Sequence, residues 1–69
     1  MNDNPDALDL ENIIDRSTLH HVIETLATIC NEKADHLRSN WQDDNAAKIW
    51  ERAAKQLDLL ASTNTVSLL

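Results

Sequence analysis

Apolar residues between positions 17 and 40 recur every three or four residues. The positions that share this spacing are Leu19, Ile23, Leu26, Cys30, Ala34, Leu37 and, just beyond, Trp41. Their average step is close to the 3.6 residues of an α-helical turn, which is typical of an amphipathic helix. The pattern therefore predicts a helix over about 17–40. Either Asp15 or Ser17 is expected to cap its first turn.

A second run of apolar residues with the same period follows at about 45–61. It consists of Ala46, Trp50, Ala53, Leu57 and Leu60. Asp43 or Asp44 is expected to cap this helix, because a short side-chain oxygen accepts a bond from a free first-turn N–H. A carboxylate there also favours the positive end of the helix dipole. We expect Glu51 and Lys55 to pair one turn apart on its outer face.

The two apolar stripes cannot lie on one straight helix and face the same partner. At about 100° per residue, the first stripe centres near roughly 90° and the second near roughly 275°. A reversal at about 40–45 brings them face to face, which predicts an all-α fold built on a two-helix antiparallel hairpin. Because the chain has no glycine, we expect Asn40 or Asn45 to adopt the left-handed conformation that ends the first helix.

One hairpin is too small to bury all its apolar residues. A chain of 69 residues buries only about 60% of its unfolded surface, and a single cysteine cannot form an internal disulfide. The first stripe spans about 140°, which is wider than one narrow helix contact requires. We therefore predict a homodimer in which two hairpins form a four-helix bundle. The residues assigned to core or dimer packing are Leu19, Ile23, Leu26, Cys30, Leu37, Trp41, Trp50, Leu57 and Leu60.

The only aromatic residues, Trp41 and Trp50, stand on either side of the predicted turn. A reversal at Asp43 and Asp44 places their rings within about one helical turn of each other. We expect them to seal this end of a core made of Leu, Ile and Ala. The alternative is an exposed anchor for a partner protein.

The N-terminal arm, residues 1–15, differs in charge from the hairpin domain at 16–62. The arm has five acids and no Lys or Arg, which leaves −1 of the net charge of −6 for the rest of the chain. One interpretation is a partly disordered leader, and another is a strip that docks on a basic partner. The arm is also compatible with an extended segment or with a short helix capped by Asn4, with Pro5 first in the helix. In the helix, Leu8, Leu10, Ile13 and Ile14 would anchor it across the hairpin.

The C-terminal tail, residues 63–69, is polar and then apolar. Tails of this kind usually fray, and that is the expectation here. The alternative is that Leu68 and Leu69 dock on a dimer mate.

The sequence also indicates a location. The first fifteen residues contain no basic segment of the kind that begins a signal peptide. No apolar run approaches the roughly 18 residues that a membrane span needs. A lone cysteine suits a reducing compartment. We therefore expect a cytoplasmic protein.

Candidate metal or acid–base residues are His20 and His21 with Glu24. His20 and Glu24 share a helix face, but two ligands do not close a metal site. Cys30 lies about 15 Å further along the helix, and we expect it to be a packed thiol because reactive thiols need an accessible, electropositive setting. We interpret the histidines as solvent-facing, with a metal or ligand site shared between subunits as the alternative.

No motif points to catalysis. Asp43 and Asp44 are explained as helix caps, a phosphate-binding loop requires glycine, and no Ser–His–Asp motif is present. We predict a non-enzymatic protein without a cofactor, which acts through protein–protein contacts in a regulatory or accessory role. The alternative is a nucleic-acid binder that uses Lys48, Arg52 and Lys55, although the acidic net charge and the lack of a third supporting helix count against it.

Overall fold

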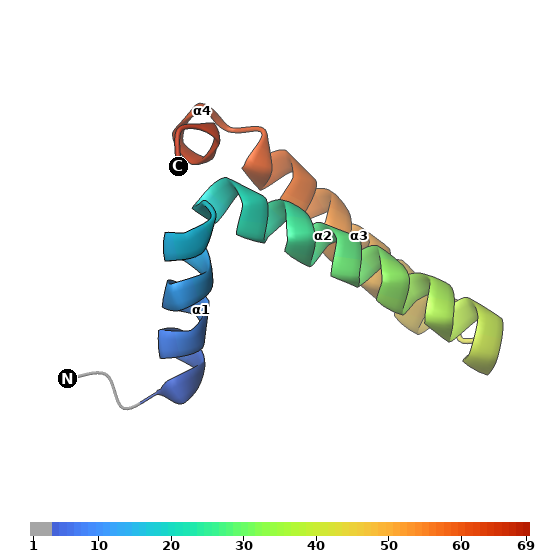
Figure 1. The fold of residues 1–69 in the computed structure, drawn as a ribbon. Helices are drawn as coiled ribbons and strands as arrows, with labels where there is room; N and C mark the ends of the chain where they lie inside the picture. The colour runs from blue at the N-terminus through green and yellow to red at the C-terminus, as the bar shows by residue number, and fades with distance from the viewer. Residues whose placement is uncertain (1–3) are drawn as a thin grey trace.

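The computed structural model describes residues 4–69, and all regular structure in this range is helical. The elements in chain order are α1 (Pro5–Arg16), α2 (Leu19–His36), the π-helical turn η1 (Leu37–Trp41), α3 (Asp44–Ala61) and α4 (Asn64–Ser67). The prediction of an all-α fold is confirmed for the described residues (Figure 1).

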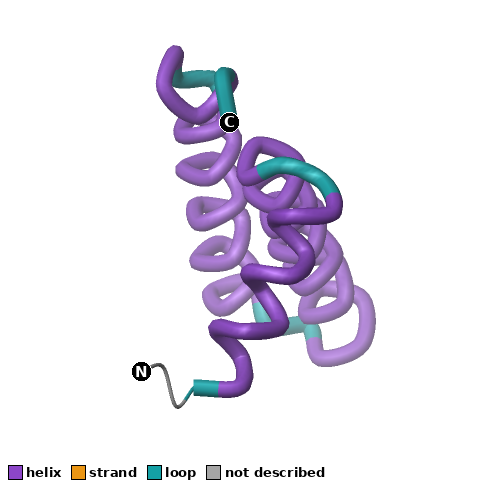
Figure 2. Tube along the Cα trace, turned by 60° about the vertical axis from the view of Figure 1, so that its left-hand side comes forward, coloured by secondary structure: helices purple, strands orange, loops and turns teal. Residues whose placement is uncertain are grey.

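Helices α2 and α3 lie side by side and run in opposite directions, joined by a tight reversal (Figures 1 and 2). The two helices correspond to the segments predicted at 17–40 and 45–61. Asp43 caps α3, because its carboxylate accepts a hydrogen bond from the Ala46 N–H at 3.0 Å. The reversal therefore lies where the change of phase between the stripes indicates, and Asp43 is one of the two expected caps.

The expected cap of the first long helix is wrong. Thr18 caps α2, with its hydroxyl oxygen accepting the His21 N–H at 2.9 Å. Asp15 and Ser17 are unavailable because they belong to the preceding helix. Asp15 lies within α1, and the hydroxyl of Ser17 donates to the Ile13 carbonyl at 2.8 Å at the end of α1.

The left-handed residue at the reversal is Gln42, with φ of 49°, and not Asn40 or Asn45. The final turn of the first long helix widens into η1, so Asn40 is still helical. Asn45 already lies in the first turn of α3. The Asp43 N–H donates to the Leu37 carbonyl at 3.1 Å and closes the widened turn.

Small side chains form the contact between α2 and α3. The most deeply buried residues of the two helices, all at most 4% exposed, are Ala27, Ala34, Ala47, Ala54 and Ala61. On each helix these alanines recur every seven residues, which is two turns, so they line one face. Side-chain size at the contact sets the distance between helix axes, and alanines permit a close approach. Cys30 is buried beside them, as predicted.

The alanine contact corrects the predicted inner stripe of the second helix. Ala46, Trp50, Ala53, Leu57 and Leu60 were expected to face the first helix. The fully buried positions are instead the three alanines of α3. The stripe of larger residues is rotated away from the contact and lies along its flank, where Trp50 and Leu60 are exposed.

The C-terminal tail folds back on the open end of the hairpin, so the expectation of fraying is wrong. Val66 in α4 is buried together with Ile23 and Ala61, and Leu19 and Leu57 pack against this cluster. The Leu19 N–H also donates to the Leu69 carbonyl at 2.9 Å. The side chains of the last two leucines stay exposed.

Residues 5–16 of the N-terminal arm are helical, which excludes the leader and the extended segment for this range. The start is the predicted one: the Asn4 side chain accepts the Asp6 N–H at 2.9 Å, and Pro5 is the first helical residue. The first three positions of the arm lie outside the described residues.

The apolar residues of helix α1 led us to expect it across the hairpin, but it does not lie there. It connects to the N-terminal end of α2 through Ser17 and Thr18 and points away from the hairpin (Figure 1). It has no buried residue, and Leu8, Leu10 and Ile13 remain exposed. The radius of gyration is consequently 14.2 Å, against about 11 Å for a compact domain of this length.

Candidate protein–protein interface

One side of the hairpin is polar and is held by an ion pair between the helices. The Arg38 guanidinium donates two hydrogen bonds to the Glu51 carboxylate, at 2.8 and 2.6 Å. Its Nε also lies 3.6 Å from Asp44. The bond from Arg38 lowers the pKa of Glu51, and the bond to Glu51 raises the pKa of Arg38. The expected pairing of Glu51 with Lys55 is replaced by this connection between α3 and η1.

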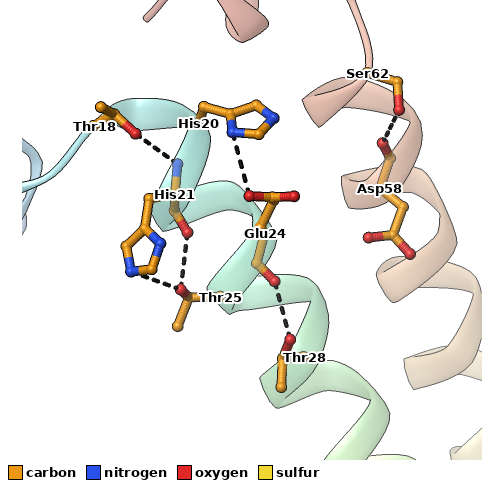
Figure 3. Close-up of polar contacts among 8 residues, drawn as sticks. All are labelled: Thr18, His20, His21, Glu24, Thr25, Thr28, Asp58 and Ser62. Carbon is orange, nitrogen blue, oxygen red and sulfur yellow. Dashed lines mark hydrogen bonds and ion pairs between the residues drawn. The ribbon is translucent and has the colours of Figure 1, made fainter.

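The candidate metal residues lie near the start of α2 (Figure 3). His20 Nδ1 is 3.2 Å from a Glu24 carboxylate oxygen, as their spacing predicts. The ring of His21 points to the other side, where Nε2 is 3.5 Å from the Thr25 hydroxyl. Within residues 4–69, no three His, Cys, Asp or Glu side chains are grouped so that they could hold a metal. A site shared between subunits stays a prediction.

The other side of the hairpin is apolar. Leu37 and Trp50 directly precede Arg38 and Glu51, so each is turned by about 100° from the ion pair. The alanine contact lies between these two directions on each helix, which places Leu37 and Trp50 on the opposite side. The large apolar residues on this side, called the apolar side below, are Leu19, Leu26, Leu37, Trp50, Leu57 and Leu60, with Ile49 at its outer edge, turned by about 100° from Trp50.

Residues assigned to core or dimer packing fall into three groups by exposure. Ile23 and Cys30 are buried, and Leu19, Leu37 and Leu57 are half-buried. The exposed members are Leu26, Trp41, Trp50 and Leu60. The single chain thus provides no cover for several of its largest apolar side chains. Their role in a dimer stays a prediction.

The two indoles do not seal the turn end of one hairpin. Trp41 is 71% exposed and Trp50 is 38% exposed. Ala34 and Ala47 occupy the contact at this end, at 1% and 0% exposure. Because these alanines bring the helices close together, the larger rings are displaced from the contact, and the predicted seal is wrong for the single chain.

A groove between α1 and α2 was not foreseen. It has a volume of about 230 Å³, and its lining residues are Leu10, Ile13, His21, Val22, Thr25, Leu26 and Ile29. We call it the α1–α2 groove. Leu26 belongs both to the groove and to the apolar side, so the two surfaces adjoin. The sequence did contain a sign of this groove: Val22 and Ile29 are apolar residues of α2 that lie outside its main stripe.

The basic residues of the second long helix do gather on one surface. Lys48, Arg52 and Lys55 line a hollow of about 260 Å³ together with Glu51. Glu51 places an acid beside the three bases, and its carboxylate is already bound to Arg38. Helix α1 does not support this surface, since among the described helices it contacts only α2. Binding of nucleic acid stays a prediction.

The fold and the surface define a class: an all-α hairpin with one polar and one apolar side. Among residues 4–69, none of the helices combines the length and the apolar character needed to cross a membrane. No protein-family model matches the chain, and no curated protein or solved structure gives a significant match. The functional argument therefore depends on the surface of the chain itself.

Proposed function

We propose that the chain is a small, non-enzymatic, helical module for protein–protein interaction, which assembles as a homodimer. In this proposal two hairpins pack through their apolar sides and form a four-helix bundle. The main observation in support is that Leu26, Ile49, Trp50 and Leu60 are exposed on one side of the hairpin. Large apolar side chains left exposed together on one side of a small protein are typical of an interaction site.

The symmetry of a homodimer suits this surface. In a twofold dimer the same patch of both subunits forms the interface, so an apolar patch can cover itself. Such interfaces bury about 800 Å² per partner, roughly one seventh of the 5441 Å² surface of the chain. The apolar side has members on both long helices, so a second copy can cover it along α2 and α3.

The polar side supports the same arrangement. Arg38, Glu51 and Asp44 lie opposite the apolar side, so they keep their contact with water when two apolar sides meet. Charged groups are depleted from the centres of interfaces because their desolvation is costly. The dimer therefore requires no buried ion pair.

A regulatory or accessory role would use a surface that the bundle leaves free. Trp41 is the most exposed large apolar side chain near the turn, and tryptophan is enriched among residues that dominate binding energy. We assign it to contact with a further partner protein. The buried lone thiol of Cys30 fits a reducing cytoplasm, which is the location that we propose.

Two neighbouring leucines of α3 provide the test. Leu60 lies on the apolar side, whereas Leu59 is turned by about 100° from it and is 63% exposed. Leu60→Glu should raise the dissociation constant of the dimer at least about tenfold, which is 1.4 kcal/mol. Leu59→Glu introduces the same charge and should change it less than about threefold. Sedimentation velocity over a concentration series measures both constants, and equal effects of the two substitutions would contradict the proposal.

A further inference from the structure

We propose that the α1–α2 groove receives helix α1 of the second copy, so that two chains interlock around a twofold axis. This inference rests on the proposed homodimer and names the contact that completes it. Both components, the groove and the helix that would fill it, are present in every chain. An interface that uses the same two components on both subunits closes as a dimer.

The apolar side chains of helix α1 are not fully covered within their own chain. Leu10 is 48% exposed and Ile13 is 38% exposed, although both line the groove. On the other wall, Ile29 is 43% exposed. An isolated helix of 12 residues is marginal in water, and Figure 1 shows that α1 leaves the hairpin and projects away. A second helix between these walls would cover the exposed parts of all three side chains.

The lengths of helix and seat agree. Twelve residues of α1 extend over about 18 Å at the 1.5 Å rise of an α-helix. The outer surface of α2 from His21 to His36 extends over about 22 Å by the same measure. Helix α1 of a second copy therefore fits along α2 without running past its end.

The seat extends beyond the groove along α2. Helix α1 carries four acids and one base, Arg16. Further along α2, a hollow of about 280 Å³ is lined by Ile29, Glu32, Lys33 and His36. Ile29 lines both this hollow and the groove, so the apolar seat continues into a region where Lys33 stands beside the acid Glu32. The match between α1 and its seat therefore depends on apolar contact, and Lys33 is the one lysine of the seat that an acid of α1 could meet.

The seat also continues the proposed bundle interface. Leu26 lines the groove and belongs to the apolar side of the hairpin. A second copy that covers the apolar side therefore lies next to the groove. Helix α1 of the second copy can then enter the groove of the first copy. By symmetry, helix α1 of the first copy enters the groove of the second.

The test is a filtered NMR experiment on full-length protein, in which copies labelled with carbon-13 are mixed with unlabelled copies. Only contacts between copies give a signal. We expect signals that connect methyl groups of Leu10 or Ile13 in one copy with those of Val22 or Ile29 in the other. Signals restricted to residues of the apolar side such as Leu60 would overturn the inference and leave the homodimer standing. A monomeric mass would overturn both.

A pair of substitutions in α1 gives an independent readout. Leu10→Asp puts a charge into the seat and should raise the dissociation constant of the dimer at least about tenfold. Asn12→Asp introduces the same side chain about 160° away around the helix and should change it less than about threefold. Equal constants for Leu10→Asp and the unaltered chain would contradict the inference, whether or not the substitution shortens α1.

Discussion

The contact between α2 and α3 differs from the apolar side in the size of its residues. The contact buries alanines, of which Ala47 and Ala34 are almost fully covered, whereas the apolar side exposes Ile49, Trp50 and Leu60. Full burial of a large aliphatic side chain contributes about 1.5–3 kcal/mol, and one methyl group contributes about 0.8 kcal/mol. The single chain therefore gains little free energy from the alanine contact, and the large side chains of the apolar side contribute less than full burial would give.

The two ends of the hairpin show a similar difference. At the open end, α4 places Val66 over Ile23 and Ala61 and closes the core. At the turn end, Trp41 is 71% exposed. The chain thus closes one end of the hairpin with its own tail and leaves a large aromatic residue free at the other.

The largest effect is expected from enlarging a residue of the alanine contact. Ala54 is 2% exposed, so Ala54→Leu must push the helices apart, and overpacking of this kind costs about 1–3 kcal/mol or more. Ala53→Leu is the matched control, because Ala53 lies on the flank, where it is only half-buried. It should change the free energy of unfolding by less than about 1 kcal/mol. Urea unfolding followed by circular dichroism measures both, and a harmless Ala54→Leu would disprove close packing of the helices.

A smaller effect is expected at the closed end. Val66→Ala removes two buried carbon atoms and should reduce the free energy of unfolding by about 1–2 kcal/mol. Leu68→Ala truncates a neighbouring side chain that is 85% exposed, and its effect should stay within about 0.5 kcal/mol. Thermal and urea unfolding of the two variants at equal concentration test the difference. Identical stabilities would mean that α4 does not close the core.

The smallest effect belongs to the polar side. The pKa of Glu51 is lowered by its bonds from Arg38, so the pair stabilises the folded chain above about pH 4.3. This stabilisation is lost as the pH falls through the lowered pKa of the folded state. Glu51→Gln should lower the melting temperature by only a few degrees at pH 7, since exposed pairs contribute little.

The same substitution should have a smaller effect at pH 2.5 than at pH 7, because the stabilisation by the Glu51 carboxylate is lost as the pH falls through its lowered pKa. Glu32→Gln is the control, since within residues 4–69 the Glu32 carboxylate takes part in none of the ion pairs. A loss that is equally large at both pH values would show that Glu51 acts through packing instead of charge.

Much of the fold was predictable because its signals are local. The change of phase between the apolar stripes and the acid at Asp43 predict the reversal, and Asn4 with Pro5 predicts the start of α1. The cap at Thr18 was missed because α1 extends to Arg16 and uses Ser17 for its own end. Docking of Val66 was missed because it depends on a surface formed by distant segments.

The interface was less predictable, because hydrophobic periodicity emphasises large residues. Leu60 and Trp50 dominate the pattern of the second helix, yet the contact is centred on Ala47, Ala54 and Ala61. Alanines occupy the contact because they allow the two backbones to come close. This close approach is a property of the helix pair and cannot be read from either segment alone. The α1–α2 groove depends in the same way on the direction in which α1 leaves the hairpin.

The mass of the unaltered chain in solution tests the central claim most directly. The claim is that the large side chains on the apolar side are covered by a second copy. Sedimentation equilibrium at micromolar concentrations should give twice the chain mass of 7.8 kDa, with dissociation only on strong dilution. A single-chain mass of 7.8 kDa for a stably folded protein at the same concentrations would contradict it.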